Sequence, residues 1–187
     1  NTFDNIKDGK RDRLGAFAEW EHRIGKQWTT LLGARYERVE SNAGDIQGYS
    51  NSYAIDANAF NNRDHQRTDN NIDLTALARY TATPMSDIEF GLARKVRSPN
   101  LYERYTWSTT TMAALMNNFV GDGNGYVGNI DLKLEKAYTA SFTFDWHAAD
   151  RNWELKATPF YTHVDDYIDA TRLTAFANTN NQFVVLK

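Results

Sequence analysis

The sequence predicts an all-β fold, an antiparallel up-and-down meander of about six strands and the start of a seventh. Three observations predict it. Apolar and polar residues alternate with a period of two along the expected strands. The connections between these stretches alternate between short turns and long polar loops. One face of every strand carries the aromatic side chains and almost no charge, whereas the other face is charged.

The expected strands follow from the alternation, taken in chain order. We expect them at Leu14–Arg23, Trp28–Arg38, Ile72–Thr81, Ile88 to the stop at Ser98-Pro99, Tyr138–Trp146 and Trp153–Tyr161, with another beginning at Phe183–Lys187. Proline ends the fourth strand because it cannot donate to a ladder. The short turns are Ile24–Gln27, Thr83–Asp87 and Ala148–Asn152. The long polar connections are Glu40–Asn70, Leu101–Leu132 and Asp165–Asn181.

The two faces of these strands differ sharply in charge. Between the strand ends, the aromatic face carries one charged residue, Arg94. The opposite face carries eleven: Glu19, Glu21, Arg35, Glu37, Asp73, Arg79, Glu89, Lys95, Asp145, Glu154 and Lys156. A soluble sandwich would cover its apolar face with a second sheet, and the sequence offers no second set of strands. We therefore expect lipid against the aromatic face, and a meander that is part of a transmembrane outer-membrane β-barrel.

Large aromatic side chains cluster beside the short turns. The set is Trp20, Trp28, Tyr80, Trp146 and Trp153. Such rings favour the membrane–water interface, where the ring body is buried and the polar tip is wet. Since short turns of outer-membrane barrels are periplasmic, this set predicts a periplasmic girdle. The alternative is a soluble β-sandwich with a Trp-rich core, which recovery from the aqueous phase without detergent would support.

Two residues fit this pattern badly. Arg94 falls on the lipid face if the alternation is unbroken, which costs about 2–4 kcal/mol at the bilayer midplane. A β-bulge near Gly91 would turn it toward the lumen instead. Pro159 lies inside a strand and leaves a ladder bond unmade, so we expect a bulge or a local break there.

Composition excludes several classes of protein. A net charge of −3 and a pI near 5.8 give no electrostatic case for nucleic acid. The absence of cysteine excludes a disulfide framework and a Cys-based zinc site. Because the chain lacks an initiator Met and a signal sequence and stops at what looks like a strand start, we expect a fragment of a longer protein.

The segment Phe90–Tyr105 resembles the barrel of TonB-dependent outer-membrane receptors. The matching residues are Ala93, Arg94, Arg97, Pro99, Asn100, Leu101, Tyr102 and Glu103. A second segment resembles the family's Gly-Asn-x-x-Leu-Lys-Pro-Glu pattern through Gly128, Asn129, Leu132, Lys133 and Glu135, with Leu134 in place of proline. A third resembles its Phe-Tyr and Asp-Asp-Tyr-Ile signature at Phe160-Tyr161 and Asp165–Ile168. The loop Thr109–Gly128 and Asp145-Trp146-His147 most resemble the copper-receptor branch.

The resemblance implies a large barrel of roughly 22 strands around an N-terminal plug. It also implies uptake driven by contact with the inner-membrane TonB complex. Residues 1–187 then form a partial barrel domain in which the plug is absent, and the expected location is the cell outer membrane. The implied function is binding and uptake of a scarce nutrient, copper or alternatively a siderophore or haem. No resident cofactor is expected, and copper enters only as cargo.

The long connection Leu101–Leu132 holds the candidate site residues. Met112 and Met116 are four residues apart and would share a face on a helical turn, where their thioethers suit Cu(I). The alternative is that both fill an apolar gap. The loop with Asp122, Asn124 and Tyr126 is the candidate for substrate contact; its alternating glycines indicate consecutive turns rather than a calcium loop.

No catalytic motif is found, and we expect no enzyme. A protease or lipase barrel would need an inward or loop-borne Ser, His and Asp set. The four histidines, His22, His65, His147 and His163, are far apart, and the alternation places none of them on the charged face with suitable partners. A third alternative is a soluble carbohydrate-binding β-sandwich that uses exposed tryptophans.

Overall fold

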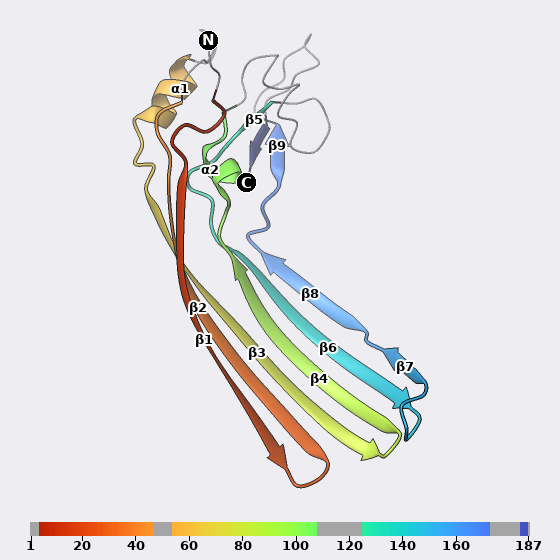
Figure 1. The fold of residues 1–187 in the computed structure, drawn as a ribbon. Coiled ribbons are helices and arrows are strands. Elements are labelled where there is room, and N and C mark those ends of the chain that lie inside the picture. Colours follow the sequence, from red (N-terminus) through yellow and green to blue (C-terminus); the bar gives the residue numbers. More distant parts are fainter. Residues whose placement is uncertain (1–3, 47–53, 108–124, 173–183, 187) are drawn as a thin grey trace.

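The computed structural model describes residues 4–46, 54–107, 125–172 and 184–186. Its main element is one twisted antiparallel sheet in which the strands follow chain order and the last two both pair with β6 (Figure 1). The strands of this sheet are β1 (Lys10–Ile24), β2 (Trp28–Asn42), β3 (Arg67–Thr83), β4 (Ser86–Arg97), β6 (Glu135–His147), β7 (Glu154–Ala157) and β8 (Phe160–Asp165). The predicted all-β antiparallel meander is confirmed.

The first three strands extend further toward the long loops than predicted. The β1–β2 ladder continues to the pair Lys10 and Asn42, and the β2–β3 ladder to Ser41 and Arg67. Backbone hydrogen bonds need no apolar side chain, so a ladder can continue where both of its faces are polar. The alternation of apolar residues fades there, and the sequence pattern therefore ends the strands too early.

The predicted strand around Pro159 is divided into β7 and β8, and both pair with β6 in a single register. Phe144 pairs with Ala157 before the break, and Ala140 pairs with Tyr161 after it. Pro159 still accepts a hydrogen bond from the Phe142 N–H at 3.1 Å, but it has no N–H to return. The expected local break is present, and it contains no inserted residue.

Cross-strand pairing sorts the side chains into rows that run across the sheet, because paired residues point to the same face. One row is Trp20, Leu32, Ala76, Leu92, Ala140 and Tyr161. The next row is Ala18, Ala34, Leu74, Arg94, Tyr138 and His163. Both lie on the aromatic face, and their large apolar members are 40–71% exposed. The other face is called the inner face below.

Aromatic residues mark two levels on the aromatic face. Two strands carry a Trp near the short turn and a Tyr eight residues away: β2 with Trp28 and Tyr36, and β6 with Trp146 and Tyr138. Trp153, just before β7, and Tyr161 on β8 have the same spacing across the break at Pro159. Eight residues of strand span about 27 Å. Beyond the tyrosine level β1 and β2 continue for six more residues toward the long-loop end.

Arg94 stays on the aromatic face, and the proposed bulge at Gly91 is wrong. Pairing of β3 with β4 runs without a shift from Leu74 to Tyr80, and the irregularity lies at Thr81–Thr83. Arg94 pairs directly with Tyr138, so it lies at the level of the tyrosines and not midway between the aromatic levels. Its guanidinium is 6.0 Å from the Tyr138 ring centroid.

The described parts of the long loops lie at one end of the sheet. Helices α1 (Ala54–Asn61) and α2 (Leu101–Tyr105) lie there with a small sheet of β5 (Tyr126–Val127), β9 (Ala170–Arg172) and β10 (Val184–Leu186) (Figure 1). The expected last strand is therefore present, but it pairs with β5 and β9 and does not extend the meander. Neither described helix is long and apolar enough to cross a membrane.

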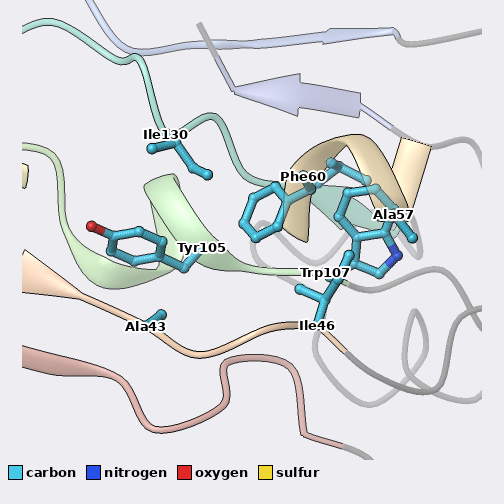
Figure 2. Packing of buried hydrophobic residues seen from close by; sticks show 8 residues of the cluster. Ala43, Ile46, Ala57, Phe60, Tyr105, Trp107 and Ile130 are labelled. Carbon is cyan, nitrogen blue, oxygen red and sulfur yellow. The ribbon is translucent and has the colours of Figure 1, made fainter. Parts of the chain in front are cut away.

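The apolar core of the molecule lies in this loop region. Phe60 on α1 packs edge-on against Trp107, with ring centroids 5.6 Å apart, beside Ala57, Ile46 and Ile130 (Figure 2). Tyr105 closes the core toward the sheet: its hydroxyl donates to the His65 carbonyl at 2.7 Å. Burial raises the pKa of Tyr105, so the hydroxyl stays a donor at neutral pH.

Candidate functional site

The inner face holds a network of ion pairs near the long-loop end. Its first centre is Glu37 on β2, a residue that is 8% exposed. Arg13 on β1 places Nη2 2.7 and 2.9 Å from the two carboxylate oxygens. Arg35 on β2 donates at 2.7 Å, and Asn71 on β3 at 3.4 Å. Donors from three strands thus converge on one carboxylate.

Arg97, the last residue of β4, is the second centre. Its Nη1 lies 2.9 Å from both oxygens of Glu103 on α2, and its Nε lies 2.6 Å from Glu135 at the start of β6. Glu135 also accepts the Ile168 N–H at 3.0 Å. Burial alone would raise the pKa of Glu135, but the bonds from Arg97 and Ile168 outweigh it and lower that pKa below its ordinary value.

The start of α2 is built by the same residues. Asn100 is the N-cap: its side chain accepts the Glu103 N–H at 2.8 Å, while Glu103 accepts the Asn100 N–H at 2.7 Å. This reciprocal pair is a capping box. Glu103 therefore caps the start of the helix and also binds Arg97. The segment that resembles the receptor family thus has a defined structural role, which is to clamp the end of β4 to the loop region.

Gly128 joins the second family-like segment to the first. A Cβ atom at Gly128 would lie 2.6 Å from the carbonyl carbon and oxygen of Arg104 and 2.7 Å from the nitrogen of Tyr105. The backbones approach this closely because Gly128 N–H donates to Thr106 O at 2.8 Å. Only glycine fits a contact between two backbones at this distance.

A buried ion pair holds α2 against the strands. Arg104 donates to both oxygens of Asp69 on β3, at 2.8 and 2.9 Å. The Arg104 side chain is 2% exposed and that of Asp69 is 10% exposed. Arg104 also donates to Ser41 Oγ and to Leu132 O, each at 3.2 Å. One guanidinium therefore connects α2, β2, β3 and the chain before β6.

Residues of the Glu37 and Arg97 networks border a cavity of about 260 Å³ on the inner face. Its lining is Arg11, Arg13, Glu37, Asn71, Val96, Arg97, Ser98 and Asn100. Arg13 and Arg97 are paired with carboxylates, whereas the buried Nε of Arg11 has no hydrogen-bond partner among the described residues. The cavity can offer guanidinium donors to a carbonyl or anionic oxygen, which is chemistry for binding rather than for a covalent reaction.

A second polar cluster lies on the inner face at the short-turn end. Asp87 and Asp145 face each other across β4 and β6, and both are 7% exposed. His147 is 5% exposed, and its Nε2 lies 3.6 Å from Asp87. His147 thus lies on the charged face beside a carboxylate, but this pair alone is not the Ser, His and Asp set that a hydrolase needs. Period-two alternation continued from Asp145 to His147 was the signal that could have found it. At 3.6 Å the pair is too long for a hydrogen bond.

Most of the predicted site residues lie outside the described residues: Met112, Met116, Asp122 and Asn124. Tyr126 is described and is 2% exposed, packed in β5 with Leu132, so its ring belongs to the loop core. Among residues 4–46, 54–107, 125–172 and 184–186, no group of three His, Cys, Asp or Glu side chains is placed to hold a metal. The methionine site and the loop contact stay predictions.

The remaining histidines have local partners. His22 stacks on Trp20, with centroids 5.2 Å apart. His65 is buried with its ring nitrogens each 2.9 Å from a carbonyl oxygen, those of Ala43 and Phe60, so it ties α1 to the end of β2. His163 lies 3.0 Å from Asp165 on the same strand.

Comparison with solved structures finds three receptors with a similar fold. The haemophore receptor HasR of Serratia marcescens, solved as a double mutant with its haemophore HasA and haem, matches with a TM-score of 0.68 at 17% identity, over 95% of this chain and 30% of that one. The copper transporter OprC matches with a TM-score of 0.65 at 15% sequence identity, over 97% of this chain and 24% of OprC. The siderophore receptor PirA of Pseudomonas aeruginosa matches with a TM-score of 0.51 at 14% sequence identity, over 95% of this chain and 37% of PirA.

Likeness at these identities shows the fold alone, and the chain spans only 24–37% of the length of these receptors. A search of curated proteins found no match. The family model described as "TonB dependent receptor-like, beta-barrel" matches residues 1–185. Because that match covers nearly every residue, the chain belongs to the TonB-dependent receptor-like β-barrel family.

Proposed function

We propose that this chain is part of the barrel wall of an outer-membrane receptor that takes up a scarce nutrient. The observation that carries the proposal is the contrast between two faces of a meander whose rows run across six strands. One face exposes Leu, Phe and Ala between two aromatic levels, and the other carries ion pairs. A lipid-facing band with aromatic girdles and a polar lumen has this pattern.

The rest of the receptor follows from the proposed role. Further strands complete the barrel, and a plug inside it contacts the TonB complex at the inner membrane. The short turns then face the periplasm and the loop region around α1 and α2 faces outward. The inner-face network around Glu37 and Arg97 lines the entrance at that outer end. In this role the protein binds and passes its cargo without changing it covalently.

Spin labels on two adjacent residues test the proposed orientation. Thr75 and Ala76 are neighbours on β3 and point to opposite faces. The chain has no cysteine, so Thr75→Cys and Ala76→Cys each add one labelling site to it. In the intact receptor in lipid vesicles, we expect label 76 to collide mainly with oxygen, which concentrates in lipid, and label 75 with a water-soluble nickel chelate. Equal collision rates at the two sites, or the reverse order, would refute the proposal.

Copper is the cargo that we propose first. The support is the pair Met112 and Met116, since thioether sulfur selects Cu(I) over hard ions. The test is Cu(I) affinity of the intact receptor, with Met112→Leu and Met116→Leu combined. We expect the double variant to lose most of its Cu(I) affinity. Met85 lies at a short turn, and Met85→Leu is the control variant. Unchanged affinity in the double variant would rule the site out.

A siderophore or haem is the second candidate cargo. Its support is that the similar solved receptors include PirA, a siderophore receptor, and HasR, solved with haem. Here Asp122 and Asn124 would make the contact, because the Tyr126 ring is buried in the loop core. Parallel titrations of the intact receptor with Cu(I), haem and a ferric siderophore separate the candidates, because each predicts tight binding of one class only.

A further inference from the structure

The aromatic face contains a hollow of about 830 Å³ that spans the two rows defined above. Alanine side chains line it at Ala34, Ala76 and Ala140, and the last two each lie between larger side chains of their row. A run of small residues between large ones leaves a depression in a surface. The hollow is therefore a shaped apolar recess on a face that, under the proposed function, contacts lipid.

Arg94 lies in the lining of this hollow, and within the described part of the chain its contacts are a carbonyl and an aromatic ring rather than a carboxylate. Its Nη1 donates to the Ile72 carbonyl, and its guanidinium lies over the Tyr138 ring. The neighbouring cations of this face differ: Arg38 lies 2.6 Å from Glu40, and Lys136 lies 3.5 Å from Asp166. A guanidinium has five N–H donors, so Arg94 retains donors for an anion from outside the chain.

We infer that Arg94 and the hollow form a binding site for a membrane lipid with an anionic phosphate headgroup. The site rests on the proposed function, which places this face in the bilayer. The phosphate accepts hydrogen bonds from Arg94 at the tyrosine level, and an acyl chain fills the recess along Ala76 and Ala140. Guanidinium suits a phosphate because two parallel N–H groups match two phosphate oxygens.

The groups around the headgroup position support one bound anion. Tyr138 and Tyr161 lie at the edge of the hollow, where phenol rings favour the headgroup layer. His163 pairs with Tyr138 across the strands and already has Asp165 at 3.0 Å. Asp165 is thus occupied by an imidazole, and Arg94 keeps donors for a phosphate.

The test is lipid retention by the intact receptor, measured by native mass spectrometry after delipidation in a neutral detergent. Phosphatidylglycerol and zwitterionic phosphatidylcholine are the probes. We expect the unmodified receptor to retain phosphatidylglycerol preferentially. Arg94→Gln should reduce that retention about fivefold to tenfold, the loss of one charge-assisted contact, and leave phosphatidylcholine unchanged. Excess inorganic phosphate should not displace the lipid, because the acyl chain supplies much of the binding.

Two further variants separate the site from bulk charge. Arg38→Gln removes an arginine from the same face outside the hollow, so phosphatidylglycerol retention should not change. Ala140→Trp fills the recess while Arg94 remains, so retention of both lipids should fall. Equal retention by Arg94→Gln and the unmodified receptor, or displacement by phosphate, would overturn the lipid site while the outer-membrane role stands. Recovery of the protein from the aqueous phase without detergent would instead refute the proposed function.

Discussion

Replacing Asp69 by asparagine is expected to destabilise the loop region of the intact receptor by about 3–5 kcal/mol. The amide keeps the shape of the side chain but leaves the Arg104 guanidinium, 2% exposed, without its carboxylate. The other acceptors of Arg104, Ser41 Oγ and Leu132 O, are neutral and cannot compensate a buried charge. Hydrogen exchange of the amides in α2 and residues 125–132 measures the free energy of local opening.

Two comparisons show whether burial is the cause. Glu21 and Arg23 form an ion pair at 3.1 Å with side chains 48% and 77% exposed, so Glu21→Gln should cost less than about 1 kcal/mol. Combining Asp69→Leu with Arg104→Met removes both buried charges and should recover much of the loss. A similar cost for Asp69→Asn and Glu21→Gln would contradict the proposed role of burial.

Introducing arginine at Ala76 is expected to destabilise the receptor in a bilayer by about 2–4 kcal/mol. Ala76 lies on β3 midway between Ile72 and Tyr80, which pair with the upper and lower aromatic residues of β2, Tyr36 and Trp28. A guanidinium there lies near the middle of the apolar band and is far from either girdle. Denaturant unfolding of the intact receptor in lipid vesicles gives the free energy.

The matched control is arginine at Thr75, one residue away on the inner face. That face already carries Arg35, Asp73 and Lys95 near this position, and it is polar. Thr75→Arg should therefore change the free energy of unfolding by no more than about 0.5 kcal/mol. Equal losses at both positions would mean that the two faces meet the same medium, which is incompatible with a barrel wall.

The sequence predicted the meander well, because a strand with one apolar face leaves a period-two pattern. It predicted the break at Pro159 for the same kind of reason, since the missing N–H is a local property. It failed where the physical cause is not local. The polar ends of β1, β2 and β3 carry no alternation, and β5 and β9 have only two or three residues each. The strand β10 was expected, but its pairing with β5 and β9 was not.

The contacts of the loop region were beyond sequence reasoning. Resemblance to the receptor family identified Arg97, Glu103 and Glu135 as signature residues. The sequence could not show that Arg97 binds both carboxylates, because this contact depends on the register of β4 and β6. The Asp69–Arg104 pair joins residues 35 apart in the chain, and no short pattern contains both. Arg94 was recognised as exceptional, and only the ladder could show that it lies beside Tyr138.

The length of β1 and β2 beyond the tyrosine level has an electrostatic consequence. With the apolar band in the bilayer, as proposed, six further residues of tilted strand raise the loop region about 15 Å above the headgroups. The Debye length at physiological ionic strength is about 8 Å. Charged lipids are therefore screened from the mouth of the receptor. An ionic cargo that arrives there meets a potential set by the wall's own arginines and carboxylates.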